Sequence, residues 1–105
     1  MHGITVEELA AWRAGERDFI LLDVREPFEL KMASLTGALH VPMRDIPERV
    51  VDLDPAAELA VMCHYGTRSE RVVQFLRSRG FTRAHNVEGG IDAYSERVDR
   101  TIPRY

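Results

Sequence analysis

Apolar residues along the chain fall into short runs separated by amphipathic segments. Residues 19–23, 38–41 and 59–62 are largely apolar and too short to be helices. Continuous apolar runs of this length are typical of strands buried on both faces of a parallel sheet. Residues 82–87 are predicted as a fourth strand.

The segments between these runs carry helix signals. Thr5 and Glu8 form a capping box, Pro27 suits a first helical turn, and Gly15 and Gly80 stand where helices end. The predicted helices are residues 5–14, 27–32, 45–51, 70–79 and 91–98, and the tail at 101–105 is predicted to be extended. Strands that alternate with helices predict an α/β fold with a parallel central sheet flanked by helices.

One junction between a strand and a helix carries most of the candidate chemistry. The run at 59–62 ends on Cys63, the only cysteine, and the loop at 64–68 leads to Ser69, a residue suited to cap the next helix. Gly66, in the middle of the loop, can take a positive φ. Cys63 therefore lies at the carboxyl edge of the predicted sheet, where ligands bind in open α/β folds.

This placement favours a reactive thiol. Unpaired N–H groups at a helix start and a nearby cation stabilise a thiolate, and Arg68 supplies a positive charge. The same donors can hold an anion beside the sulfur. The alternative is a buried cysteine that packs as a small apolar residue. The glycine-centred loop, Arg68 and the helix start favour the reactive thiol.

Asp23 and Arg25 end the strand at 19–23, at the same predicted edge as Cys63. They are candidates for supporting the site. Charged residues at buried edges are usually paired, however, so we favour an ion pair or hydrogen bonds that brace the loops.

Composition limits the class of protein. The 105 residues suit a single domain, residues 1–105, with its own core. The net charge of −3 gives no basis for nucleic-acid binding. No apolar run reaches the roughly 20 residues that cross a membrane, and the amino terminus has no signal-peptide pattern. A single cysteine excludes an internal disulfide and suits a reducing compartment, so we expect a cytoplasmic protein.

The histidines give no metal-ligand spacing with Cys63, so no metal site is predicted. They are His2, His40, His64 and His85. His64 follows the cysteine directly, a position equally consistent with substrate contact and with exposure to solvent. A Cys/His hydrolase would need the imidazole beside the thiol. A loop that curls around the sulfur turns side chains outward, which disfavours that mechanism.

The loop sequence Cys-His-Tyr-Gly-Thr-Arg-Ser resembles the active-site loop Cys-x-x-Gly-x-Arg-Ser of the rhodanese family of sulfurtransferases. Residues 22–29, 37–42 and 87–94 resemble further motifs of that family, in the same order. Two positions depart from the family pattern. Tyr94 replaces the usual tryptophan of Gly-Gly-x-x-x-Trp, and residues 33–36 (Ala-Ser-Leu-Thr) stand where Gly-His-Ile-Pro is common.

The resemblance implies a rhodanese-like three-layer sandwich with a parallel sheet of four to five strands, the fifth near Gly3. It implies sulfur transfer through a persulfide on Cys63, without a cofactor. The donor would be a small molecule such as thiosulfate, and the acceptor cyanide or a thiol, including one on a protein. The implied substrate-binding residues are those of the loop: His64, Tyr65, Gly66, Thr67, Arg68 and Ser69. The oligomeric state is not indicated.

Two alternatives share this fold class. Cysteine phosphatases and arsenate reductases use a Cys-x5-Arg loop, whereas Cys63 and Arg68 have Cys-x4-Arg spacing and no acidic residue lies between them. Non-catalytic rhodanese-like regulatory modules typically lose the cysteine, which this chain keeps together with Gly66. Sulfur transfer is the function that the residues favour.

Overall fold

The computed structural model describes residues 2–105, which form a five-stranded parallel sheet. Its strands are β1 (Gly3–Ile4), β2 (Ile20–Asp23), β3 (Leu39–His40), β4 (Leu59–Met62) and β5 (Ala84–Val87). They lie in the order β1-β5-β4-β2-β3, and every neighbouring pair is parallel. Asp23 of β2 pairs with Met62 of β4, so these two strands end at the same level, one residue before Cys63.

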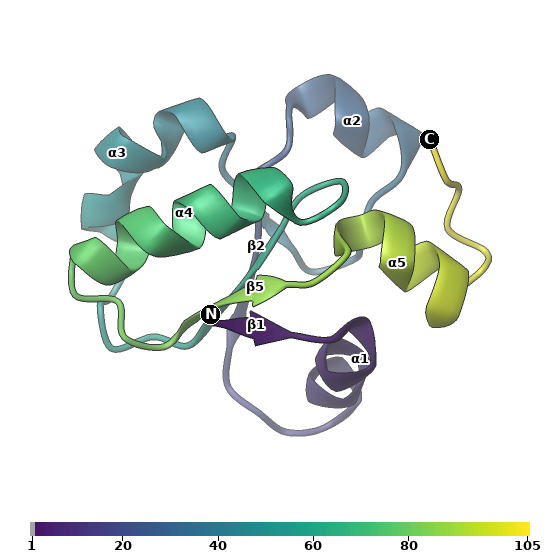
Figure 1. Cartoon of the computed structure of the whole chain (residues 1–105), viewed down its shortest axis with the longest axis horizontal. Helices are drawn as coiled ribbons and strands as arrows, with labels where there is room; N and C mark the ends of the chain where they lie inside the picture. Colours follow the sequence, from purple (N-terminus) through teal and green to yellow (C-terminus); the bar gives the residue numbers. More distant parts are fainter. Residues whose placement is uncertain (1) are drawn as a thin grey trace.

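The helices cover both faces of the sheet and complete a three-layer α/β sandwich (Figure 1). They are α1 (Val6–Ala14), α2 (Pro27–Met32), α3 (Ile46–Arg49), α4 (Thr67–Ser78) and α5 (Gly90–Arg97), with short 3-10 turns η1 (Met43–Asp45) and η2 (Val50–Asp52) on either side of α3. None of these helices within residues 2–105 has the length and hydropathy to span a bilayer.

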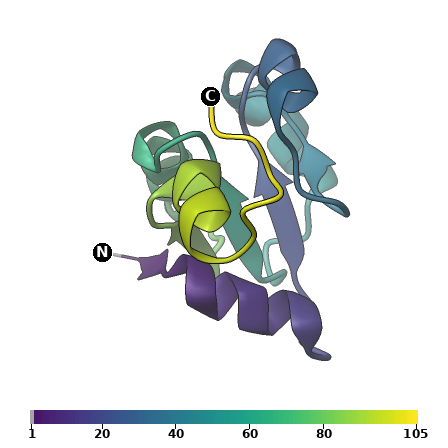
Figure 2. The ribbon, with the colours of Figure 1, turned by 90° about the vertical axis from the view of Figure 1, so that its right-hand side faces the viewer.

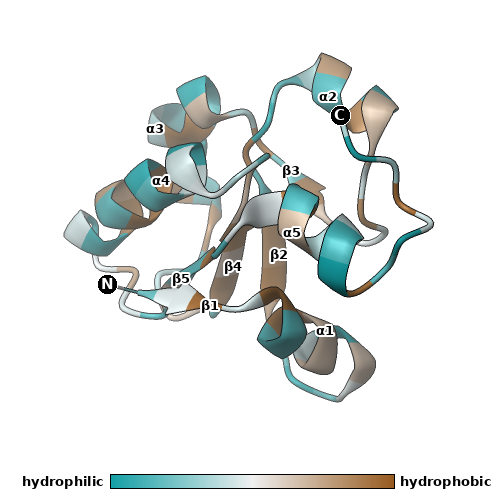
Figure 3. Ribbon diagram, turned by 45° about the vertical axis from the view of Figure 1, so that its right-hand side comes forward, coloured by the Kyte–Doolittle hydropathy of each residue, from teal (hydrophilic) through white to brown (hydrophobic). Residues whose placement is uncertain are grey.

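Each strand of the sheet centre sends alternate side chains to opposite faces, which produces two apolar clusters. Leu59 and Val61 of β4 join the cluster beneath α3 and α4, while Ala60 and Met62 join the cluster beneath α1 and α5. Figure 3 shows the apolar strands β2 and β4, in brown, between helices in which polar and apolar residues are mixed. Burial on both faces explains why the run at 59–62 is continuously apolar.

Three predictions of local structure need correction. Helix α4 begins at Thr67 with Gly66 as its N-cap, so Ser69 lies inside the first turn and does not cap the helix. The helix predicted at 45–51 is divided into η1, α3 and η2. The predicted strand at 38–41 is reduced to Leu39–His40. The strand Gly3–Ile4, which only the family resemblance implied, is present and pairs with β5.

Candidate active site

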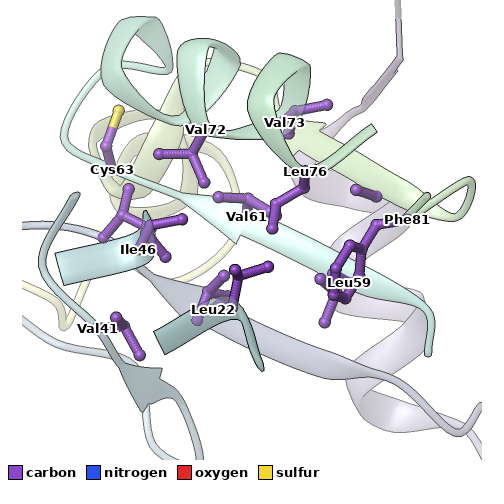
Figure 4. Close-up of a cluster of buried hydrophobic side chains, with 13 residues drawn as sticks. Leu22, Val41, Ile46, Leu59, Val61, Cys63, Val72, Val73, Leu76 and Phe81 are labelled. Atoms are coloured by element: carbon purple, nitrogen blue, oxygen red, sulfur yellow. The ribbon is translucent and has the colours of Figure 1, made fainter. Parts of the chain in front are cut away.

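Cys63 follows β4 directly and lies at the edge of the cluster beneath α4. Its side chain is 1% exposed. Figure 4 shows its sulfur directed away from the apolar side chains. The carboxyl end of β4 and the start of α4 therefore place the thiol where backbone N–H groups are unpaired.

Two backbone N–H groups and one side-chain hydroxyl lie within hydrogen-bond distance of this sulfur. The Gly66 N–H lies 3.0 Å from Cys63 Sγ, the Ser69 N–H 3.4 Å and the Ser69 hydroxyl 3.3 Å. All three groups are buried, and two of them belong to the backbone, so their positions are fixed by the loop and by α4. Such an arrangement stabilises negative charge on the sulfur.

Two glycines make the loop geometry possible. Gly66 has φ +102°, in the left-handed region where other residues are strained. A Cβ on Gly90 would lie 2.5 Å from the Cys63 carbonyl oxygen and 2.4 Å from that of His64. The lack of a side chain there lets the Ile91 N–H donate to the Cys63 carbonyl at 3.0 Å. The start of α5 thus holds the loop from the other side.

Arg68 is paired with a buried carboxylate. Its guanidinium donates to both oxygens of Glu29 on α2, at 2.7 and 2.8 Å. These bonds lower the pKa of Glu29 to about 2 and raise the pKa of Arg68. The charge that the sequence suggested for an anionic donor is therefore already bound to Glu29, although the Arg68 side chain stays 31% exposed.

Asp23 and Arg25 form the ion pair that the sequence favoured. Arg25 Nη2 lies 2.7 Å from Asp23 Oδ2, and both side chains are buried. Arg25 also donates to the Ala33 carbonyl at 2.9 Å, which ties the end of β2 to the segment after α2. No described contact joins this pair to Cys63, so the pair braces the loops around the site.

His64 lies between two tyrosine rings. Its ring centroid is 3.8 Å from that of Tyr65 and 3.8 Å from that of Tyr105. Its Nε2 is buried and has no hydrogen-bond partner among the described residues. The ring is therefore packed between aromatic neighbours and does not point freely into solvent.

Tyr105 joins several parts of the site. The segment after α5 runs back toward α2 (Figure 2). There the Tyr105 hydroxyl donates to Glu29 at 2.8 Å and accepts from Arg25 at 2.9 Å. Burial raises the pKa of Tyr105 to about 12, so the hydroxyl keeps its proton. The site thus depends on the tail, which sequence analysis described only as extended.

The remaining loop residues, Tyr65 and Thr67, have exposed side chains. Tyr65 is 59% exposed, and Thr67 is exposed at the first position of α4. Both line a surface concavity of about 600 Å³ that also borders Gly66 and Asn86, but Cys63 is not on its wall. Residues 2–105 contain no group of three or more His, Cys, Asp or Glu side chains that could hold a metal ion.

Sequence reasoning missed Glu29, Asn86 and Tyr105. Asn86 is the residue before the end of β5, near the same sheet edge as Cys63, and its position three residues before Gly89 was a usable signal. Glu29 lies within the matched segment 22–29 but was not singled out. Tyr105 gave no local signal.

The family model for the rhodanese-like domain matches residues 5–97. The chain belongs to the rhodanese-like domain family. A protein of Staphylococcus aureus described as a rhodanese-like domain protein has a solved structure with a TM-score of 0.86, at 30% identity, covering 100% of this chain and 99% of that one. The fold and the family are thus established together.

Curated relatives bear related names. The chain is 32% identical to a protein of Allochromatium vinosum named sulfurtransferase, over 88% of this chain and 86% of that protein. It is 43% identical to the Arabidopsis thaliana Rhodanese-like/PpiC domain-containing protein 12, chloroplastic, over 81% of this chain. The chain spans 30% of the length of that Arabidopsis protein, and about a fifth of two Zea mays relatives.

Proposed function

We propose that this domain is a sulfurtransferase that carries sulfane sulfur as a persulfide on Cys63. The observation that carries the proposal is the environment of Cys63 Sγ: two backbone N–H groups donate to it, and the Ser69 hydroxyl lies 3.3 Å away. These donors suit a sulfur that becomes anionic. Membership of the rhodanese-like family and relatives named sulfurtransferases support the same chemistry.

In the first half-reaction, the Cys63 thiolate attacks the outer sulfur of an anionic donor such as thiosulfate. A sulfur–sulfur bond forms to Cys63, the bond within the donor breaks, and sulfite leaves with its electron pair. The outer sulfur of the persulfide then carries the negative charge. N–H groups of the loop and of the first turn of α4 stabilise that charge, helped by the positive end of the helix dipole.

In the second half-reaction, a nucleophile attacks the outer sulfur, and Cys63 leaves as the thiolate. Cyanide would give thiocyanate, and a thiol would give a new persulfide on a small molecule or a protein. The chain has no second cysteine to displace the sulfur internally. Turnover would therefore follow a ping-pong pattern that depends on acceptor concentration.

Loop residues 64–69 are the proposed substrate-binding segment, with the backbone carrying most of the binding. Arg68 can still approach an anion with its exposed part, but its charge is shared with Glu29. Asp23 and Arg25 would act indirectly by holding the surrounding loops. Such chemistry suits a reducing compartment such as the cytoplasm, where a thiolate persists.

Thiocyanate formation from thiosulfate and cyanide tests the proposal. The wild-type protein should produce thiocyanate, and Cys63→Ser should fold yet produce none, because an oxygen cannot carry a persulfide. Ser95→Ala is the control for a change at a buried small side chain. Ser95 is also buried, but its hydroxyl donates to the Ile102 carbonyl and not to Cys63, so this variant should still produce thiocyanate. Turnover of an aryl phosphate without thiocyanate formation would instead support the cysteine-phosphatase alternative.

A further inference from the structure

The hydroxyl of Ser69 lies between two groups that compete for its hydrogen. Ser69 Oγ is 3.3 Å from Cys63 Sγ and 2.5 Å from the side-chain oxygen of Asn86. The three residues are buried, and Ser69 is fully inaccessible. Solvent therefore does not reach the Ser69 hydroxyl, and the group that lacks its hydrogen loses a buried hydrogen bond.

The orientation of the Asn86 amide is set by its other contact. Asn86 Nδ2 donates to the carbonyl oxygen of Gly66 at 3.2 Å, and the opposite orientation would place two acceptors against each other. The amide oxygen must therefore face Ser69. Asn86 thereby spans the loop, with one end on the N-cap residue of α4 and the other on the third residue of that helix.

A serine hydroxyl has one hydrogen and two lone pairs. When Cys63 is a thiol, its S–H can donate to Ser69 Oγ while Ser69 donates to Asn86, and all three groups are satisfied. When Cys63 is a thiolate, the sulfur has no hydrogen and needs donors. The Ser69 hydrogen must then turn to the sulfur, which leaves the Asn86 oxygen without a partner.

We propose that Asn86 is a positioning residue that sets whether the Ser69 hydroxyl accepts from, or donates to, the sulfur of Cys63. By holding the hydroxyl hydrogen, Asn86 favours the thiol in the resting protein. The inference rests on the proposed function for its role in turnover. The competition of Cys63 and Asn86 for the Ser69 hydrogen is independent of that function.

The two half-reactions use the hydroxyl at defined moments. Cys63 Sγ bears negative charge when it attacks the donor and again when the acceptor displaces it. In the persulfide the charge lies on the outer sulfur, so Sγ needs no donor and the Ser69 hydrogen returns to Asn86. The Gly66 and Ser69 N–H groups already face Sγ, and Arg68 is already paired with Glu29, so neither group competes for the Ser69 hydrogen.

A double-mutant cycle on the rate of Cys63 alkylation tests this competition. Iodoacetamide at one fixed neutral pH reports the reactivity of the sulfur without any sulfur donor. Ser69→Ala should slow alkylation about tenfold, because the thiolate loses a donor. Asn86→Leu should speed it about threefold, because the hydroxyl is released to the sulfur. The double variant should react at the rate of Ser69→Ala alone.

A purely structural role for Asn86 gives a different result. If Asn86→Leu only loosened the loop, it would speed alkylation equally in the presence and absence of the Ser69 hydroxyl, and such additivity would overturn the proposal. Asn86→Asp is the second variant, should Asn86→Leu unfold. Its carboxylate holds the hydroxyl hydrogen more strongly than the amide does. Asn86→Asp should therefore slow alkylation more in the protein that keeps Ser69 than in the Ser69→Ala protein. An equal effect in the two proteins would also overturn the proposal.

The same variants separate this inference from the proposed function. A coupled cycle in a protein that forms no thiocyanate would leave the hydroxyl competition standing and remove sulfur transfer. An additive cycle in a protein that does form thiocyanate would overturn the proposed role of Asn86 and leave sulfur transfer standing.

Discussion

Arg68 and Glu29 show that a charged residue beside a nucleophile need not bind substrate. The carboxylate of Glu29 is buried and receives two bonds from Arg68, one from Tyr105 and one from the Glu26 N–H. Removal of one partner of such a pair leaves an uncompensated charge inside the protein. The Arg68–Glu29 pair therefore links α2 to α4 and braces the loop that leads from Cys63 into α4.

Arg68→Ala should lower the free energy of unfolding by about 3 kcal/mol, the low end for a broken buried pair because Arg68 is partly exposed, since Glu29 loses its cation. Urea denaturation measures this loss. Arg97→Ala is the control, since the Arg97–Glu7 pair is about half exposed on each side and should matter little. If Arg68→Ala instead kept its stability and only raised the KM for thiosulfate, Arg68 would be a substrate ligand and not a brace.

The pH dependence of stability should reveal Glu29. Its pKa is about 2 in the folded protein and 4.5 as an ordinary carboxyl, so the folded state binds its proton less readily. The stabilisation is complete above about pH 4.5 and is lost as the pH falls toward 2. Glu29→Gln should flatten this part of the stability curve in urea denaturation between those pH values. An unchanged slope would mean that other carboxylates account for it.

The pairing of Arg68 with Glu29 could not be predicted from the sequence, because 39 residues separate the two. Cys63, its position after a strand and the family of the loop were readable, since each depends on neighbouring residues. The bonds to Glu29 and Tyr105 depend on how α2 and the tail pack, which no local pattern encodes.

At the scale of elements, the start of α4 is where local propensity gave way to tertiary contacts. Ser69 looked like an N-cap, but its hydroxyl is used by Cys63 and Asn86. Gly66 takes the N-cap position in a left-handed conformation. The helix consequently begins three residues earlier than predicted, which brings the Ser69 N–H to the sulfur.

Gly66→Ala should therefore reduce activity more than stability. The backbone strain of a left-handed alanine costs about 1 kcal/mol, and the added Cβ would lie 3.2 Å from the Gly89 nitrogen. The shift that relieves this contact would move the N–H that donates to Cys63. Gly80→Ala is the matched control, because Gly80 has φ +94° with open space around it and no contact with the site.

Thiocyanate production and urea denaturation of these two variants decide the point. Both should lose similar stability, but only Gly66→Ala should lose most of its activity. Equal activity in the two variants would remove the loop N–H from the mechanism.

At the scale of the whole molecule, the tail after α5 contacts α2 beside the site. Tyr105 lies 76 residues from Glu29 in sequence and bonds to it directly. The layered α/β fold followed from the alternation of strands and helices. The course of the tail did not, because it depends on hydrogen bonds from Tyr105 to Arg25 and Glu29, which are far away in the sequence.

Tyr105→Phe should keep the stacking on His64 but lose both hydroxyl contacts, at a cost of about 1–2 kcal/mol in unfolding free energy. Tyr65→Phe should be neutral, since the Tyr65 hydroxyl bonds to none of residues 2–105 while its ring stacks on the other side of His64. Thermal or urea unfolding of the two variants provides the measurement. Equal stability of both would show that the tail is not held by its hydroxyl.

Intact-protein mass spectrometry after treatment with thiosulfate and removal of excess donor tests the central claim most directly. The wild-type protein should gain the mass of one sulfur atom, Cys63→Ser should gain none, and cyanide should return the wild-type mass to its starting value. If the wild-type protein formed thiocyanate in steady state but carried no added sulfur, transfer would not proceed through a persulfide on Cys63.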